Sequence, residues 1–361
     1  MGGDLIRQWV RSEIRALSAY HVPEAAGLIK LDAMENPYIW PQALRREWAA
    51  MMEGVDVNRY PDPRGAALKT RLCEVWPVPE EAALLLGNGS DEIIQMIALT
   101  LAAPGRCILS VEPGFVMYRM IASFTGMDYE GVPLHGTDFS LDMPAMLDAM
   151  ERLQPAVLFL ACPNNPTGNL FDPEHVRTLI EAAPGLVVVD EAYTPFTDAS
   201  FLPLVGRWPN LVVMRTVSKM GLAGLRLGVL AGPGTWVEEI DKTRLPYNIN
   251  TLTQVTADFA LRHHEVFDEQ TRRIRADRET LFETLAAIDG LTPFPSEANF
   301  ILVRCPLGRA DEIHRRLRDE AGVLVKNLHG AHPLLADCLR LTVGRPEEND
   351  VLTGALQQIL T

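Results

Sequence analysis

Short apolar runs recur between about residues 80 and 232 and alternate with longer amphipathic stretches. The runs are apolar at nearly every position, which is typical of strands covered by helices on both faces. They read AALLL, RCILSV, AVLFLAC, GLVVVD, NLVVMRT and RLGVLAG. Helical periodicity marks the stretches between them, and one of these opens with Asp172 as N-cap and Pro173 in its first turn. The pattern predicts an α/β fold with a mostly parallel central sheet.

The pattern changes after residue 250. A long charged helical region is followed by the apolar runs ANFILVRC, GVLVKN and CLRLTVG, which predict a smaller α+β domain. The first 40 residues are too few to form a core of their own. We therefore expect an N-terminal arm over residues 1–40 that packs on the small domain, a large domain over 41–250 and a small C-terminal domain over 251–361.

Composition and charge narrow the functions open to this chain. It has 361 residues and a formal net charge of -14, which argues against general binding to nucleic acid or anionic membranes. Its five cysteines form no CxxC pair, and the adjacent His263 and His264 point apart on a helix, so no metal site is predicted. No apolar stretch is long enough for a membrane span or a signal peptide, so we expect a cytoplasmic protein.

Two glycine-containing turns follow predicted strands, where α/β proteins gather their ligands. Gly87-Asn88-Gly89 runs into Ser90 and Asp91, which open an apolar-periodic helix. Such a turn can present helix N-terminal N–H groups to a phosphate, although an ordinary capped helix has the same pattern. The turn in CPNNPTG, which contains Asn165, also has a purely structural interpretation.

Two charged residues also follow predicted strands. Asp190 ends the run GLVVVD, and a carboxylate there requires a cationic partner or a hydrogen-bond network. Lys219 follows NLVVMRT within TVSKMGLAGLRLG, a stretch of small residues. A solvated loop is the commonest environment of a lysine, but here the chain order places it beside the other three motifs.

Taken together, the motifs resemble those of fold-type I pyridoxal-phosphate enzymes, and most closely the histidinol-phosphate aminotransferase family. The resemblance covers nearly the whole chain. It rests on AYHVPEA, ENPY, RYPD, GNGSDE, PGFVMY, CPNNPTG, DEAY, SKMGLAGLR and CLRLTVG. It implies a dimeric aminotransferase with pyridoxal 5'-phosphate as its cofactor.

The resemblance assigns roles around the cofactor ring. Lys219 would bond covalently to the cofactor and later move a proton at the substrate, which requires a pKa lowered toward neutrality. Asp190 would pair with the pyridine nitrogen, while Asn165 and Tyr193 would hydrogen-bond the phenolic oxygen. Phe115 would stack on the ring, although a plain core position is the alternative for an aromatic residue.

The same resemblance implies a phosphate site. The N–H groups of Ser90 and Asp91, the Ser218 hydroxyl and the Arg226 guanidinium would hold the cofactor phosphate. Tyr60 of RYPD would reach it from a neighbouring subunit, which implies a homodimer with sites completed across the interface.

Substrate residues are implied as well, and the sequence departs from the family at several positions, among them Met34 and Ile39, where Asn and Gly are usual. Arg340 would clamp a carboxylate, and Tyr20 and Asn165 would lie near the substrate. Lys326 stands where the family usually has an arginine for the substrate phosphate, and lysine offers a point charge without the planar fork. The span from Lys219 to Arg226 is one residue shorter than is common, so we expect a tighter loop or a displaced arginine.

These residues predict transamination between histidinol phosphate and 2-oxoglutarate, in histidine biosynthesis. One alternative is an aromatic amino-acid aminotransferase using the same site. Another is a decarboxylase of the threonine-phosphate type, because the sequence does not show which substrate bond stands perpendicular to the cofactor ring. A regulator on the same fold would need an additional DNA- or partner-binding domain, for which neither length nor charge leaves room.

Overall fold

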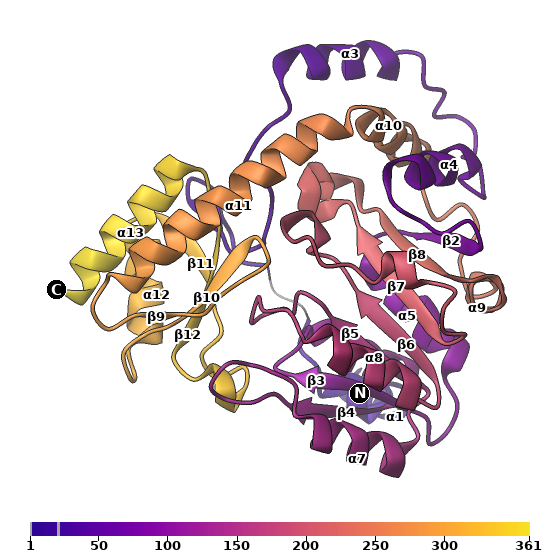
Figure 1. Cartoon of the computed structure of the whole chain (residues 1–361), viewed down its shortest axis with the longest axis horizontal. Coiled ribbons are helices and arrows are strands. Elements are labelled where there is room, and N and C mark those ends of the chain that lie inside the picture. Colours follow the sequence, from indigo (N-terminus) through magenta and orange to yellow (C-terminus); the bar gives the residue numbers. More distant parts are fainter. Residues whose placement is uncertain (1, 20–21) are drawn as a thin grey trace.

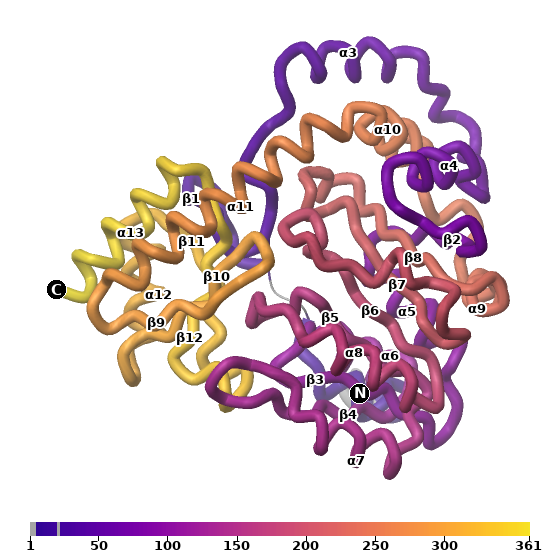
Figure 2. Tube along the Cα trace, in the orientation of Figure 1, coloured from indigo at the N-terminus to yellow at the C-terminus, as the bar shows by residue number. Residues whose placement is uncertain are grey.

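The computed structural model describes residues 2–19 and 22–361. They form a large and a small domain, connected by the long helix α11 (His264–Ala286), which runs from the large domain on the right to the small domain on the left (Figure 1). The tube view shows the same path, with the chain entering α11 from α10 (Thr251–Arg262) (Figure 2).

A seven-stranded sheet in the order β2-β8-β7-β6-β5-β3-β4 forms the centre of the large domain. β8 runs antiparallel to both of its neighbours, and the other adjacent strands are parallel, which confirms the prediction of a mostly parallel sheet. All six predicted strands are present. The strands are β2 (Ala82–Gly87), β3 (Cys107–Glu112), β4 (Asp128–Pro133), β5 (Val157–Ala161), β6 (Leu186–Asp190), β7 (Leu211–Thr216) and β8 (Gly228–Pro233).

Helices cover both faces of this sheet, because alternate residues of each strand face opposite cores. In β6, Val187 and Val189 join the core on one face and Val188 joins the core on the other. The first face is covered by α4 (Ala66–Val75), α7 (Met143–Leu153), α8 (Pro173–Ala182) and α10. The second is covered by α5 (Ser90–Leu101), α6 (Val116–Thr125) and α9 (Gly234–Asp241).

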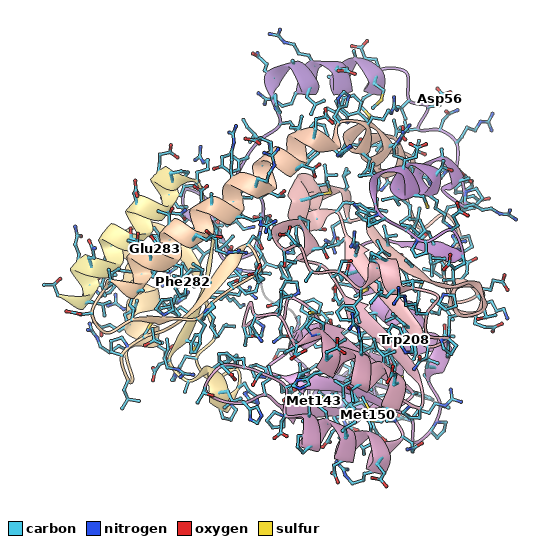
Figure 3. All side chains as sticks on the ribbon, in the orientation of Figure 1. Asp56, Met143, Met150, Trp208, Phe282 and Glu283 are labelled. Carbon is cyan, nitrogen blue, oxygen red and sulfur yellow. The ribbon has the colours of Figure 1, made fainter. Side chains whose placement is uncertain are left out.

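In α7 and α8, the local sequence determines where the helix begins or which of its faces packs on the sheet. The Asp172 carboxylate accepts a hydrogen bond from the Glu174 N–H at 2.8 Å, so the predicted N-cap of α8 is confirmed. On α7, Met150 lies in the core and Met143 packs against it at the edge of the domain (Figure 3). Residues seven apart on a helix share a face, so both methionines contact the same side of the sheet.

The small domain contains a five-stranded sheet in the order β1-β11-β12-β10-β9. Its core is formed with α11, α12 (Ala310–Asp319) and α13 (Pro346–Leu360). The three runs predicted as strands correspond to β10, β11 and β12. The strands are β1 (Ile29–Leu31), β9 (Thr292–Pro293), β10 (Phe300–Arg304), β11 (Val323–Asn327) and β12 (Cys338–Thr342).

The N-terminal arm and α11 each contact both domains. β1 pairs with β11, but the start of the arm, α1 (Gly2–Trp9) and α2 (Ser12–Arg15), reaches the large domain, where Arg11 donates to the Phe124 carbonyl of α6. Leaving the arm, the chain forms α3 (Gln42–Met52) at the outer edge, and Asp56 follows it (Figure 3). Within α11, Phe267 packs in the cluster that holds most of the large-domain core, and Ile274 packs in the cluster that holds most of the small-domain core, so this helix contributes to both.

His263 and His264 both lie beside carboxylates at the junction of α10 and α11. His263 Nε2 is 3.5 Å from Glu47, and His264 Nδ1 is 2.8 Å from Asp268. Within residues 2–19 and 22–361, no cluster of three His, Cys, Asp or Glu side chains is arranged for a metal ion. In the same part of the chain, no helix combines the length and apolar character that crossing a membrane requires.

Candidate active site

The carboxyl ends of β5, β6 and β7 meet the N-terminus of α5 at a pocket of about 110 Å³. The structure brings together here every residue predicted to hold the cofactor except Tyr60. The pocket is lined by Met34, Ser90, Asp91, Phe115, Ala161, Asn165, Asp190, Ala192, Tyr193, Thr216, Ser218, Lys219 and Arg226.

Lys219 lies in a single π-helical turn, Ser218–Leu222, directly after β7. Its Nζ donates to the Ala33 carbonyl at 3.4 Å and lies 5.8 Å from the centre of the Tyr193 ring. Burial, together with the positive charge of Arg340, lowers the pKa of Lys219 from 10.5 to about 8. A substantial fraction of the amine is therefore neutral near physiological pH.

The short span from Lys219 to Arg226 closes by tight turns. The π-helical turn is followed by a 3₁₀ turn, Ala223–Leu225, and Arg226 then takes a left-handed backbone conformation with φ 49°. The Arg226 guanidinium reaches the Asp91 carboxylate at 3.2 Å and lines the pocket. The tighter loop therefore keeps the arginine in place.

Two glycines open the space at the start of α5. Gly89 has φ 83°, and a Cβ there would collide with the Arg226 guanidinium. A Cβ on Gly228 would lie 2.6 Å from the Gly89 carbonyl carbon and 2.7 Å from the Ser90 nitrogen. Together with the free N–H groups of the helix N-terminus, this cradle suits a phosphate group.

Asp190 is buried at the end of β6 and held by hydrogen bonds. Its carboxylate accepts from the Tyr118 hydroxyl at 2.8 Å and from the Ala192 N–H at 3.1 Å. Burial raises the pKa of Asp190 from 3.8 to about 7, against the opposing effect of the Tyr118 hydrogen bond. Among the described residues Asp190 forms no salt bridge, so a cationic ring nitrogen would supply the charge partner that a buried carboxylate needs.

Sequence reasoning missed Tyr118. The residue lies in the first turn of α6, three positions after Phe115, and packs edge-on against it with ring centres 5.5 Å apart. A signal was present, because the tyrosine of the motif PGFVMY falls one helical turn after the predicted stacking residue.

Asn165 connects the cofactor pocket to the small domain. Its amide nitrogen donates to the Tyr193 hydroxyl at 3.0 Å, and its carbonyl oxygen accepts from Arg340 at 2.6 Å. Arg340 is buried and also donates to the Asp32 carbonyl at 3.0 Å. The two halves of the site are therefore joined through one asparagine side chain.

A second cavity, of about 630 Å³, adjoins the first and shares Met34, Phe115 and Asn165 as walls. Lys326 and Arg340 both line it. They lie directly opposite one another on β11 and β12, which places their side chains on the same face of the small sheet. The cavity thus has two cations at its small-domain end.

Tyr60 lies away from this pocket in its own chain. Tyr60 is 81% exposed, does not line the pocket of its own chain and stacks on Tyr247 with ring centres 4.5 Å apart. Tyr20 lies outside the described residues.

Comparison with known proteins identifies the family to which this site belongs. The family profile for "Aminotransferase class I and II" matches residues 26–356. The chain is a member of this aminotransferase family.

This aminotransferase is similar over nearly its whole length to proteins named histidinol-phosphate aminotransferase. It is 52% identical to histidinol-phosphate aminotransferase 2 of Nitrosococcus oceani, over 99% of each chain. It is also 52% identical to the histidinol-phosphate aminotransferase of Chromobacterium violaceum, over 98% of each chain. The crystal structure of histidinol-phosphate aminotransferase from Sinorhizobium meliloti in complex with pyridoxal-5'-phosphate aligns with a TM-score of 0.87 and 25% identity, covering 98% of this chain and 97% of that one.

Pyridoxal phosphate is the cofactor of this aminotransferase, and the pocket fits it on three structural grounds. The cradle at Gly89 and Gly228 leaves room for a phosphate, and the buried Asp190 awaits a cationic nitrogen. Lys219 Nζ faces the same pocket with a lowered pKa. Phosphate, ring nitrogen and aldehyde are thus each matched by a group of the chain.

Proposed function

We propose that this aminotransferase transfers the amino group of histidinol phosphate to 2-oxoglutarate, yielding imidazole acetol phosphate and glutamate in histidine biosynthesis. The observation that carries the proposal is the pairing of Lys326 with Arg340 beside the cofactor pocket. Two neighbouring cations suit a phosphate dianion in one half of the reaction and the carboxylates of 2-oxoglutarate or glutamate in the other. The names of the relatives agree with this substrate.

The side chains of the pocket divide the work of the reaction. When bound, pyridoxal phosphate supplies the electron sink for the electrons left at the substrate carbon. Lys219 Nζ, with its pKa of about 8, would take the proton from the substrate Cα and deliver it to C4′, the aldehyde carbon of the cofactor. Asp190, oriented by Tyr118, keeps the ring nitrogen protonated.

The polar groups around Asn165 place the substrate. Arg340 contacts Asn165, which in turn contacts Tyr193, so substrate binding at the guanidinium is mechanically connected to the cofactor ring. Lys326 would add the second cation at the phosphate.

The proposal includes a homodimer in the cytoplasm, with Tyr60 completing the site of a second subunit. Support comes from the exposure of Tyr60 and of two apolar residues close in sequence to the stacked pair Tyr60 and Tyr247. These are Val57, close to Tyr60, and Leu245, close to Tyr247. A tyrosine that is exposed in one chain can supply its hydroxyl to a neighbour's phosphate site.

Assays with purified holoenzyme test the substrate. Histidinol phosphate and phenylalanine are each supplied with 2-oxoglutarate, and glutamate formation is followed. We expect turnover of histidinol phosphate, and we expect Lys326→Ala to raise its KM about tenfold or more, the effect of losing one charge-assisted contact. Activity on phenylalanine alone would overturn the proposal in favour of an aromatic amino-acid aminotransferase.

Subunit mixing tests the shared site. Lys219→Ala and Tyr60→Ala chains are unfolded and refolded together, so that mixed dimers hold one intact site. We expect the mixture to recover up to about one quarter of wild-type activity, the share expected for random pairing in a dimer with two isologous sites. Activity no higher than that of the Tyr60→Ala protein alone, at the same concentration of that chain, would contradict a site shared between subunits.

A further inference from the structure

The large-domain side of the 630 Å³ cavity includes Glu112, which lies at the carboxyl end of β3. The Glu112 side chain is only 18% exposed. It lies across β4 at Gly131, where a Cβ would collide with its Cγ and Cδ atoms. A glycine at this position therefore allows the carboxylate to lie flat against the sheet and reach the cavity.

Neighbouring side chains fix the direction of this carboxylate. One oxygen forms an ion pair with Arg119, whose guanidinium also lies 5.0 Å from the centre of the Tyr129 ring. The other oxygen, Oε2, faces Nε2 of His332 at 3.8 Å. Arg119 and Tyr129 also line the cavity, so the carboxylate lies between neighbours that belong to the same wall.

His332 shows which chemistry suits this position. Its Nδ1 accepts a hydrogen bond from the Leu334 N–H at 3.2 Å, so the proton of the neutral ring is on Nε2, directed toward Glu112. The distance of 3.8 Å is too long for a hydrogen bond. The structure thus brings an imidazole N–H beside the Glu112 carboxylate without joining them.

Two cations line one side of the cavity, and the other side carries the Glu112 carboxylate, which is paired with Arg119. Lys326 and Arg340 belong to the small-domain sheet, whereas Glu112 belongs to the large-domain sheet. A substrate with a phosphate at one end and a ring N–H at the other matches this arrangement. We propose that Glu112 accepts a hydrogen bond from the imidazole N–H of the amino substrate and thereby selects an imidazole over a phenyl ring.

This inference rests on the proposed function, because it names the residue that binds the imidazole end of histidinol phosphate. A phenyl ring in the same place would cover the carboxylate and offer no donor. A site built to hydrogen-bond a substrate group discriminates strongly against an analogue that lacks the group, since its own polar atom is left unpaired. Glu112 would therefore determine specificity while the proton transfer at Lys219 is unchanged.

The test compares two substrates in two enzymes, with 2-oxoglutarate as the acceptor. Histidinol phosphate and phenylalaninol phosphate share the amine and the phosphate and differ only in the ring. In the wild-type holoenzyme we expect kcat/KM to favour the imidazole by about 100-fold or more. In Glu112→Leu we expect this ratio to fall at least tenfold, because the carboxylate that accepts from the imidazole N–H is lost.

Matched variants separate specificity from folding. Glu130→Leu removes a carboxylate from the same strand pair, but Glu130 is half exposed, pairs with Arg152 and does not line the cavity, so its substrate ratio should stay at the wild-type value. Glu112→Gln keeps an acceptor of the same shape and should give an intermediate ratio. If Glu112→Leu fails to fold, the Glu112→Gln ratio decides.

The outcomes distinguish the two levels of the proposal. Wild-type enzyme that does not turn over histidinol phosphate overturns the proposed function, and this inference with it. Wild-type enzyme that turns over histidinol phosphate, with an unchanged substrate ratio in Glu112→Leu or, failing that, in Glu112→Gln, overturns the role of Glu112 alone.

Discussion

The cofactor end and the substrate end of the site are built in different ways. The cofactor end takes its polar groups from successive strand ends of one sheet, including Asp190 at the end of β6 and Lys219 after β7. The substrate end combines residues from both domains, with Glu112 on one side and Arg340 on the other. The contrast indicates that the chemistry is fixed within one rigid layer, whereas specificity depends on how the two domains meet.

The largest effect should come from removing the lysine at the cofactor end. Lys219→Ala loses both the covalent attachment and the proton carrier, so we expect kcat to fall by more than about 10³-fold. Lys242→Ala, which removes an exposed lysine from the end of α9, is the control and should leave kcat unchanged. Near-wild-type turnover by Lys219→Ala would show that this end of the site has been misassigned.

Neutralising the buried acid should have the next largest effect. Asp190→Asn keeps a group of the same shape beside Tyr118 but loses the charge that stabilises a protonated ring nitrogen, so kcat should fall about 10²- to 10³-fold. Tyr118→Phe removes only the orienting hydrogen bond and should cost about tenfold. Stopped-flow measurement of the first half-reaction checks both values. Equal losses in the two variants would contradict the separate roles.

The phosphate cradle should respond to a single methyl group. In Gly228→Ala the new Cβ meets backbone atoms of Gly89 and Ser90, which cannot move without shifting the start of α5. We expect the Kd for pyridoxal phosphate to rise about 10- to 100-fold, the loss of one or two charge-assisted hydrogen bonds. Gly234→Ala is the matched control, because a Cβ there has no neighbour within 4 Å. Fluorescence titration of the apoenzyme measures both.

The smallest effect concerns the connection between the two ends. The Arg340 charge contributes to the lowered pKa of Lys219, after burial. Cofactor attachment requires the neutral amine, so its rate should rise with pH through about 8 in the wild-type apoenzyme. Removing a nearby cation favours the charged amine, so Arg340→Gln should move this midpoint to higher pH.

The control for this titration is Arg318→Gln, which removes a half-exposed arginine from the same domain. Its midpoint should equal that of the wild type. A midpoint that also stays unchanged in Arg340→Gln would mean that the two ends act independently.

The contrast also explains how much of the molecule was predictable. Six strands of the large sheet could be predicted because continuous apolar runs mark strands buried on both faces. The edge strand β4 could not, because DYEGVP contains no continuous apolar run and only Val132 in it is buried. Most of the predicted cofactor residues follow strand ends and lie in local motifs, so resemblance to a known family was enough to assign them.

The rest depends on contacts between segments distant in sequence. Tyr118 reaches Asp190 across 72 positions, and Glu112 reaches the cavity only because Gly131 on the next strand has no side chain. The N-terminal arm divides between the domains because β1 pairs with β11 while Arg11 bonds to α6. Contacts of this kind cannot be predicted from hydrophobic periodicity or local composition.

The central claim is that Lys219 carries the cofactor, and mass spectrometry of the borohydride-reduced holoenzyme tests it most directly. Reduction fixes the cofactor on its lysine, and peptide mapping then locates the added mass. We predict that the modification lies on Lys219 within the sequence TVSKMGLAGLR. A modification found on Lys326 or any other lysine, with Lys219 unmodified, would contradict the assignment.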